Sequence, residues 1–303
     1  MPERLALIDW PNVDVQGLLS ALPIAVFAAI LIFEVVRPRR RLRASPLRRW
    51  VGNTGLFLIN TAAVLPLAQA GAAMVDGFSL RSDLLGRASA PFHYLAGQIG
   101  GVILLDLLLY LLHRAYHLVP FLWRFHAVHH ADTDVDATTA VRHHPGEHLA
   151  NYAILSLVAA ALGLSPAAIV VYGVLVLTLQ MAQHANIDFP EWLDRQVRRA
   201  VVTPNMHRVH HSIALREGNS NFGTVLSIWD RLWRTYLEPT ASRRAAADFG
   251  VQGLEDRRYQ RLHWMLLTPA MIGSAPLSPQ RGEPPSISPT GADAPAEARI
   301  ARE

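Results

Sequence analysis

The sequence predicts an all-α, polytopic membrane protein with about four to five transmembrane or membrane-embedded helices. It also predicts a cytoplasmic helical cap that carries a histidine-rich site for two metal ions. Of the 303 residues, 51% are hydrophobic and only 17% are charged, whereas a typical soluble domain has about 25% charged residues. Long apolar runs alternate with polar segments, and three of the polar segments contain clusters of histidine.

Four apolar regions predict the membrane helices, because about 20 apolar residues are enough to cross a bilayer. They are residues 18–36, 51–75, 95–112 and 149–182. The last region is long enough for two helices, with a turn at the GLSP sequence of residues 163–166. The stretch that precedes residue 17 is acidic rather than basic, so we expect the first run to be a membrane helix and not a cleaved signal peptide.

The same pattern divides the chain into four parts. We expect N-terminal transmembrane helices over residues 1–90, the histidine-bearing domain over 91–240 and a C-terminal helical segment over 241–267. Residues 268–303 are dominated by Pro, Ser, Ala and Gly, and such a segment buries too little apolar surface to offset the entropy lost on ordering. We therefore expect a disordered tail there.

Arginine indicates the orientation of these helices. Seven arginines lie within residues 37–49, and more lie within 195–208, which places both segments on the cytoplasmic side by the positive-inside rule. All three histidine clusters then fall on that side. We expect an integral protein of a bacterial inner membrane with its metal site on the cytoplasmic face. The net charge of +4 lies beside apolar segments, which favours contact with lipid over binding of nucleic acid.

The histidine clusters are the strongest functional signal. They are His113 and His117 in HRAYH, His126, His129 and His130 in HAVHH, and His207, His210 and His211 in HRVHH. Positions i, i+3 and i+4 lie on one face of a helix, so we expect each cluster to aim its imidazoles at one point. Imidazole is the commonest side-chain metal ligand, and eight rings exceed the needs of one tetrahedral ion.

Other residues narrow the chemistry. Cysteine is absent, which excludes disulfides, iron–sulfur clusters and blue-copper sites. Asp106 lies seven residues before His113 in an apolar run. It either accepts a hydrogen bond from a ligand imidazole, fixing its tautomer, or pairs with an Arg or Asn of another helix. His93 and His263 stand alone, and we expect them to be interfacial or hydrogen-bonded residues.

The motifs together resemble the fatty acid hydroxylase / sterol desaturase superfamily of integral-membrane di-iron oxygenases. HRAYH, HAVHH and HRVHH match its HX3H, HX2HH and HX2HH pattern. Further matches are the RxHPxE sequence from Arg142 to Glu147, the HxN sequence of His184 and Asn186, and NFGTVLSIWDRLWRTY after the last box. The resemblance covers roughly residues 95–237, so the two N-terminal helices and the tail lie outside it.

The resemblance implies a set of iron ligands. They are His113, His117, His126, His129, His130, His207, His210 and His211, with His184 as a ninth ligand and His144 as a further candidate. Some relatives carry another histidine four residues before the HxN motif, where this chain has Gln180. His144, water or nothing would then fill one coordination position. His143 and His148 have no firm counterpart, and we expect them to be solvated or hydrogen-bonded.

The resemblance also implies the activity. Two irons and O2 would oxidise a C–H bond of a lipid, giving an alcohol by hydroxylation, our first choice, or a double bond by desaturation, the alternative. A rival of another class is a histidine-rich metal transporter, although transport sites usually lie on broken helices near the membrane midplane. A catalytically inactive homologue is a further rival that the complete histidine set disfavours.

Electrons would have to come from a separate donor, a ferredoxin or a cytochrome with its reductase. The sequence has no GxGxxG nucleotide motif and no cysteines for a cluster. Arginines such as Arg195, Arg198 and Arg199 would dock either an acidic redox partner or anionic lipid headgroups, of which we favour the headgroups.

Overall fold

The computed structural model describes residues 15–43, 46–83, 91–241, 243 and 248–272. In this part of the chain the protein is helical and has no strand beyond two isolated bridges. The helices are α1 Val15–Val36, α2 Pro46–Asp83, α3 Pro91–Leu118, α4 Pro120–His130, η3 Ala137–Val141, α5 Pro145–Ala161, α6 Pro166–His184, α7 Glu191–Val197, α8 Pro204–His210, α9 Leu215–Gly218, α10 Ile228–Leu232, η4 Arg257–Gln260 and α12 Leu262–Met271. The predicted all-α fold class is confirmed.

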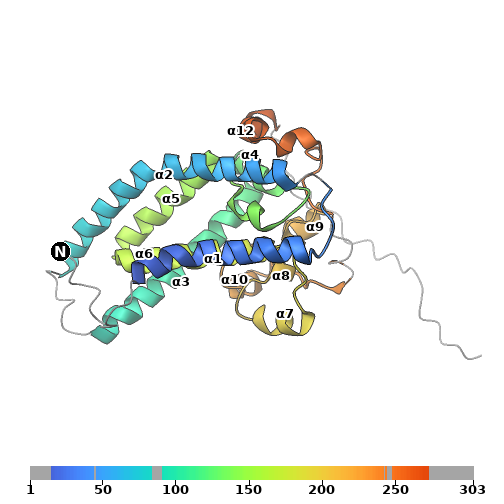
Figure 1. Ribbon diagram of the computed structural model, residues 1–303. Helices are drawn as coiled ribbons and strands as arrows, with labels where there is room; N and C mark the ends of the chain where they lie inside the picture. Colours follow the sequence, from blue (N-terminus) through green and yellow to red (C-terminus); the bar gives the residue numbers. More distant parts are fainter. Residues whose placement is uncertain (1–14, 44–45, 84–90, 242, 244–247, 273–303) are drawn as a thin grey trace, which may run out of the picture.

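The long helices and the short helices form two regions (Figure 1). The helices α1, α2, α3, α5 and α6 extend to one side, and the short helices α7 to α10 gather at the other end. Within the long-helix region α2 packs along α5 and α1 packs along α6. The short helices therefore form a cap at one end of the apolar helices, as predicted.

Three helical stretches in the described residues are long and apolar enough to cross a membrane. They are Pro46–Gly71 in α2, Leu95–Leu118 in α3 and all of α6, Pro166–His184. Little of their surface is buried inside the protein, so their apolar side chains remain available to lipid. The apolar part of α1, Ala21–Val36, is shorter, and α5 has 17 residues.

Proline and side-chain caps begin the helices that carry the site. Proline is the first residue of α4, α5, α6 and α8, where its missing N–H has no intrahelical partner to lose. The hydroxyl of Ser165 accepts from the Ala168 amide at α6, and that of Thr203 accepts from the Met206 amide at α8. Gly163, at φ +62°, supplies the left-handed residue of the predicted turn between α5 and α6.

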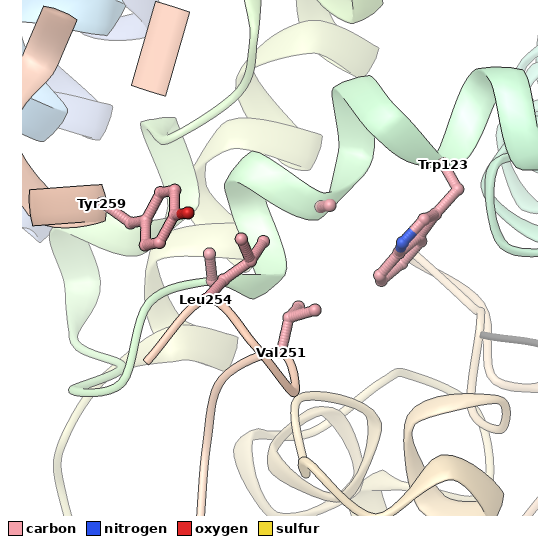
Figure 2. Packing of buried hydrophobic residues seen from close by; sticks show 6 residues of the cluster. Trp123, Val251, Leu254 and Tyr259 are labelled. Carbon is pink, nitrogen blue, oxygen red and sulfur yellow. The ribbon is translucent and has the colours of Figure 1, made fainter. Parts of the chain in front are cut away.

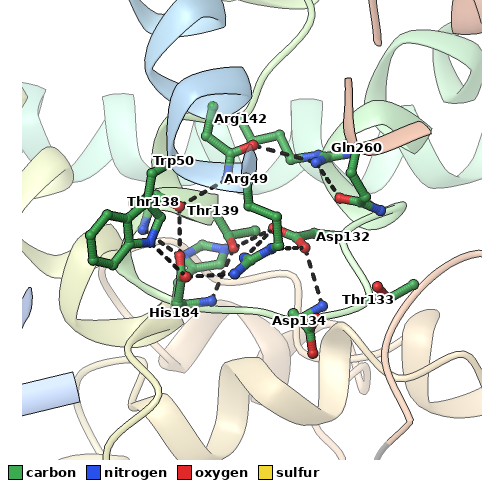
Figure 3. Close-up of polar contacts among 12 residues, drawn as sticks. Arg49, Trp50, Asp132, Thr133, Asp134, Thr138, Thr139, Arg142, His184 and Gln260 are labelled. Carbon is green, nitrogen blue, oxygen red and sulfur yellow. Dashed lines mark hydrogen bonds and ion pairs between the residues drawn. The ribbon is translucent and has the colours of Figure 1, made fainter. Parts of the chain in front are cut away.

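A buried polar network joins the long helices to the cap (Figure 3). The Arg49 guanidinium of α2 donates to both carboxylate oxygens of Asp132, at 3.0 and 2.8 Å, and to Asp136 at 2.6 Å. Arg142 is also fully buried, and donates to the Gln260 side chain and the Tyr259 carbonyl. Ionised groups that are fully desolvated in this way need complete pairing, so the network fixes the segment between α4 and α5 against α2.

The C-terminal segment packs onto the cap instead of standing apart from it. Trp123 of α4 shares an apolar cluster with Val251, Leu254 and Tyr259 (Figure 2). Helix α12 continues to Met271, with Thr268 buried, so the expected disordered tail does not begin at residue 268. Residues 273–303, which make up the rest of that expected tail, lie outside the described residues, as do residues 1–14 and 84–90.

Candidate metal centre

Four helix ends bring nine histidines together. His113 and His117 lie in the last turns of α3, His184 ends α6, and His126, His129 and His130 lie at the end of α4. His207 and His210 belong to α8, and His211 caps it. These are the eight clustered histidines and the ninth, His184, that were predicted from the sequence. They form two groups of possible metal ligands.

The first group, called here the five-histidine site, has its ligand atoms within 4.8 Å of one another. It contains His113, His117, His126, His130 and His210. The Nε2 atom of every one of these rings is buried, and among the described residues it has no hydrogen-bond partner. An unsatisfied buried nitrogen costs about 1–3 kcal/mol, so five of them in one place require an electron-pair acceptor such as a metal ion.

The second group, called here the four-histidine site, contains His129, His184, His207 and His211. The Nε2 of His184 lies 3.2 Å from that of His129, and 3.0 Å from those of His207 and His211. The Nδ1 of His184 lies 2.7 Å from the Gln180 carbonyl, which can only accept a hydrogen bond, so Nδ1 carries the proton and Nε2 is a bare lone pair. That lone pair accepts one hydrogen bond at best, whereas three nitrogens approach it.

These separations fit a metal ion. With metal–nitrogen bonds near 2.1 Å, neighbouring ligand nitrogens lie about 3.0 Å apart in an octahedron and about 3.4 Å apart in a tetrahedron. The observed 3.0–3.2 Å falls in that range. The donor set is all imidazole, which suits iron, zinc, copper or nickel.

The division between the sites corrects the expectation that each cluster aims at one point. His126 and His130 belong to the five-histidine site, but His129 between them belongs to the four-histidine site. In HRVHH, His207 and His211 share the four-histidine site and His210 joins the other. Residues i and i+4 share a helix face, whereas adjacent residues point about 100° apart, so each of these clusters serves both sites.

The second ring nitrogen of four ligands has an acceptor that orients it. His113 donates through Nδ1 to the Phe222 carbonyl at 2.8 Å, and His210 donates to the Ser220 carbonyl at 2.7 Å. His126 donates to the Glu147 carboxylate at 2.9 Å, and His184 donates to Gln180 as described. Such partners hold the tautomer that leaves Nε2 free for a metal.

Glu147 is the site residue that the sequence analysis missed. Its Oε1 accepts from Nδ1 of His126 and, at 3.1 Å, from Nδ1 of His143. The His143 ring in turn stacks on His129, with centroids 4.4 Å apart. Glu147 is the final residue of the RxHPxE motif, so the motif was a signal, but residue spacing did not show which imidazole it would meet.

The structure assigns His144 to another role. Its Nδ1 accepts from the Gly146 amide at 3.0 Å, which makes it the N-cap of α5. Its Nε2 lies 3.2 Å from the Leu266 carbonyl and donates to it. Because both nitrogens are occupied, His144 belongs to neither site, and the expectation that it is a further ligand is corrected.

Asp106 does not contact an imidazole, which corrects the expectation that it orients a ligand. Its carboxylate accepts from the indole N–H of Trp229 at 2.7 Å and from the amides of Leu226, at 3.0 Å, and Val225, at 3.2 Å. The Tyr172 hydroxyl donates to it at 3.4 Å. The alternative partner, an Arg or Asn of another helix, is not observed either.

The NFGTVLSIWDRLWRTY segment is folded tightly against α3. Asp230 accepts from the amides of Phe222 and Gly223, both at 2.8 Å. A side chain at Gly223 would place its Cβ 2.8 Å from Val202 and 2.9 Å from Asp230, so this position requires glycine. The segment thereby positions the carbonyl of Phe222, on which His113 is oriented.

Burial sets the protonation state of the ligands that lie outside the membrane-spanning stretches. It lowers the pKa well below the ordinary value of 6.5 for five of them, and neighbouring imidazoles lower it further. These are His129, His130, His207, His210 and His211. At neutral pH all five rings are uncharged and present a lone pair, which is the state that binds a metal.

Aromatic side chains enclose the five-histidine site. The Phe222 ring lies 5.1 Å from that of His117 and 5.5 Å from that of His210. Trp123 lies 5.1 Å from His117 on another side. A small cavity of about 30 Å³ borders His117, His130 and Trp123, which is room for about two water molecules.

Comparison with known proteins agrees with this geometry. Residues 98–235 match the family model described as fatty acid hydroxylase. Over these residues the chain resembles fatty acid hydroxylases. This match lies within the residues 95–237 over which the motifs resembled the superfamily, and it contains all nine histidines of the two sites, together with Asp106 and Glu147.

The proteins to which this chain is similar include several lipid-modifying enzymes. Ornithine lipid hydroxylase OlsE of Rhizobium tropici is 31% identical over 153 residues, covering 50% of this chain and 45% of the relative. Alkylglycerol monooxygenase of Caenorhabditis elegans is 29% identical over 133 residues, covering 43% and 25%. Cholesterol 25-hydroxylase of Rattus norvegicus is 28% identical over 154 residues, covering 48% of each chain.

The chain thus spans less than half the length of each of these relatives. No solved structure shows a significant match.

Proposed function

We propose that this protein is a membrane-bound, O2-dependent oxidoreductase that uses two iron ions to hydroxylate a C–H bond of a lipid. The observation that carries the proposal is the pair of buried all-histidine sites. Among the described residues the Nε2 atoms of the five-histidine site have no hydrogen-bond partner, and those of the four-histidine site converge on one another at 3.0–3.2 Å. Two irons bound there would supply the oxidising power to insert one oxygen atom of O2 into an unactivated C–H bond.

The ligands proposed for the iron ions are the nine histidines of the two sites. Five belong to the five-histidine site and four to the four-histidine site, so the sets are unequal. The backbone carbonyl of Gln180 accepts from Nδ1 of His184, and the coordination position at which some relatives carry a further histidine would be filled by water or left empty. His144 is not included.

The surrounding side chains bind and protect the centre. Phe222, Trp123 and Tyr116 pack on ligand rings, which limits the access of water and holds the imidazoles still. Glu147 keeps the proton of His126 on Nδ1. A preorganised site with restricted water access favours oxidation of a bound substrate over unproductive release of reactive oxygen.

A lipid substrate is supported by two observations. The apolar faces of α2, α3 and α6 are exposed, so a lipid can approach the protein from the bilayer. The relatives include enzymes named for ornithine lipid, alkylglycerol and cholesterol. We propose an inner-membrane location with the metal centre on the cytoplasmic face, because Arg39, Arg40 and Arg43 adjoin the cap side of α1.

The balanced reaction requires a partner. One C–H bond and O2, with two electrons and two protons, give one alcohol and one water. We propose that a separate ferredoxin or cytochrome, with its reductase, delivers the electrons. A metal transporter is disfavoured because the histidines lie at the ends of α3, α4, α6 and α8 and not on helices broken at a midplane.

Lipid mass spectrometry of cells with and without the gene tests the proposal. We expect one lipid class to gain a single oxygen atom when the protein is present, and to lose it in His129→Ala. The purified protein should contain two irons per chain, with less in His129→Ala. His263→Ala, which changes an exposed histidine outside both sites, is the matched control and should behave like wild type.

Other outcomes would contradict hydroxylation. A loss of two hydrogens from a lipid, with no added oxygen, would indicate a desaturase. Exchangeable zinc without O2 consumption, or an unchanged lipidome under aerobic growth, would contradict both oxidative activities.

A further inference from the structure

An arginine-rich cleft lies between α7 and α10, apart from the metal centre. The cleft is open, has a volume of about 510 Å³, and is lined by Arg195, Arg198, Arg199, Arg231, Tyr236, Glu191 and Glu238. Four arginines face two glutamates, which leaves a formal charge of +2. The cleft is therefore suited to an anionic group.

The carboxylates of the cleft are already engaged. Arg198, which is buried, donates to Glu191 at 3.0 Å and also pairs with Asp194 and Glu238. The Arg231 guanidinium is held on the Ser227 and Arg198 carbonyls, at 2.9 and 2.8 Å. Arg198 and Arg231 therefore hold the walls of the cleft together through these contacts.

The other two arginines are available. Arg195 and Arg199 are exposed, and the described part of the chain gives their side chains no ion pair. Trp192 precedes them by three and seven residues, and these spacings place the three side chains along one face of the helix and its extension. That face presents two exposed guanidiniums beside a large aromatic ring.

Exposed apolar side chains lie on the two helices that bound the cleft, α7 and α10. Trp192 is 70% exposed, Leu232 is 61% exposed and Ile228 is 45% exposed. Hydrogen bonds of Ser227 to the Arg198 and Ala200 carbonyls hold α10 beside α7. Tryptophan and arginine next to exposed aliphatic residues are typical of the boundary between a membrane and water.

The position of α10 along α3 places this surface at such a boundary. The indole of Trp229 binds Asp106, which lies twelve residues before the end of α3 at Leu118, about 18 Å along the helix. On the other side of Asp106, the α3 residues Ile99, Ile103 and Leu104 are 54%, 40% and 48% exposed. Helix α10, which bounds the cleft, is thus held on α3 at Asp106, next to the exposed apolar part of a membrane-spanning stretch.

We propose that the α7–α10 surface lies on the membrane and that Arg195 and Arg199 bind the phosphate of an anionic phospholipid headgroup, while Trp192 and Leu232 enter the interface. The inference does not depend on the metal sites. An acidic protein partner would match the charge of the arginines, as an anionic phospholipid does, but it would not match the exposed apolar side chains. The adjoining bilayer would also obstruct its approach.

The test uses the purified full chain in uncharged detergent and measures its thermal unfolding midpoint. The titrants are short-chain phosphatidylglycerol, short-chain phosphatidylcholine and inorganic phosphate. We expect phosphatidylglycerol alone to raise the midpoint. In Arg195→Ala/Arg199→Ala its half-saturating concentration should rise by roughly 25-fold, at about five-fold for each arginine near a lipid surface. Arg257→Ala/Arg261→Ala, which removes two exposed arginines on the α12 side of the cap (Figure 1), should respond like wild type.

A second measurement locates the surface. Phosphatidylglycerol brominated near the headgroup should quench tryptophan fluorescence less in Trp192→Phe than in wild type, once the protein is in lipid nanodiscs. Equal quenching would place Trp192 away from the bilayer and overturn the proposal.

Three further results, two from the titration and one that adds a reduction assay with an acidic electron donor, would also overturn it. An unchanged lipid response in the double arginine variant would exclude the cleft. A phosphate or phosphatidylcholine response equal to that of phosphatidylglycerol would exclude an anionic headgroup. A normal lipid response combined with slower reduction by an acidic electron donor would make the surface a docking site for that donor.

Discussion

At the scale of single residues, the proton on one imidazole nitrogen decides whether the other can bind a metal. The Phe222 and Ser220 carbonyls can only accept, so they hold a proton on Nδ1 of His113 and His210. Glu147 does the same for His126, with a charged acceptor that makes a stronger hydrogen bond than a carbonyl. Glu147 is therefore the residue through which metal affinity is most open to change without removing a ligand.

We expect Glu147→Ala to weaken metal binding at the five-histidine site by roughly 10- to 100-fold, as removal of such a partner does in other metal sites. Glu147→Gln keeps an acceptor oxygen near His126 and should lose less. Metal retained per chain against increasing chelator measures both. Equal retention in wild type and Glu147→Ala would show that His126 does not depend on the carboxylate.

His144 provides the complementary prediction, because the structure makes it a helix cap and not a ligand. His144→Ala should cost about 1 kcal/mol of stability through loss of the bond from the Gly146 amide. Its metal content should equal that of wild type. Thermal unfolding and metal analysis of the same preparation check both parts, and a loss of one metal ion per chain would restore His144 to the ligand set.

At the scale of elements, two buried carboxylates hold the segment after α9 against α3. Asp106 binds its Val225–Trp229 portion and Asp230 binds the amides of Phe222 and Gly223. The carbonyl of Phe222 then meets His113, seven residues after Asp106 on α3. Asp106 thus contributes to the metal centre through the backbone of a loop and not by touching an imidazole.

We expect Asp106→Ala to destabilise the protein by at least about 3 kcal/mol, because the Trp229 indole and two backbone amides lose their acceptor in a buried place. His113 should lose its orientation as a result, so metal affinity of the five-histidine site should fall as well. Asp106→Asn retains one acceptor oxygen, so its stability and its metal affinity should lie between those of wild type and Asp106→Ala. Chemical unfolding with metal analysis measures this, and a stable Asp106→Ala with full metal content would contradict the role.

At the scale of the whole molecule, the apolar runs and the histidine spacing were enough to predict the long helices, the cap and eight of the nine histidines, and the family resemblance added His184. The spacing did not predict how His129 and His130 divide between two sites, because that depends on how α4 is rotated against α3 and α8. Nor did the spacing predict the hydrogen bond from His126 to Glu147 or the ion pair of Arg49 with Asp132. Those contacts join residues 21 and 83 positions apart, and only tertiary packing brings them together.

The metal-free protein should lose stability in acid, because folding buries neutral histidines. Burial lowers the pKa of His129, His130, His207, His210 and His211 well below 6.5. The unfolded chain takes up protons on these rings below pH 6.5 while the folded chain does not, so the free energy of unfolding falls as the pH decreases through that range. Each ring contributes up to about 1.4 kcal/mol for each pH unit below 6.5.

Thermal unfolding of chelator-treated protein in detergent, between about pH 8 and pH 5.5, measures this dependence. The midpoint should be level above pH 7 and should fall steeply below 6.5. Protein reloaded with iron should keep its unfolding midpoint down to a lower pH, since metal ions compete with protons for the lone pairs. A metal-free protein with the same midpoint at both ends of the range would mean that these five imidazoles do not enter the folded core as uncharged rings.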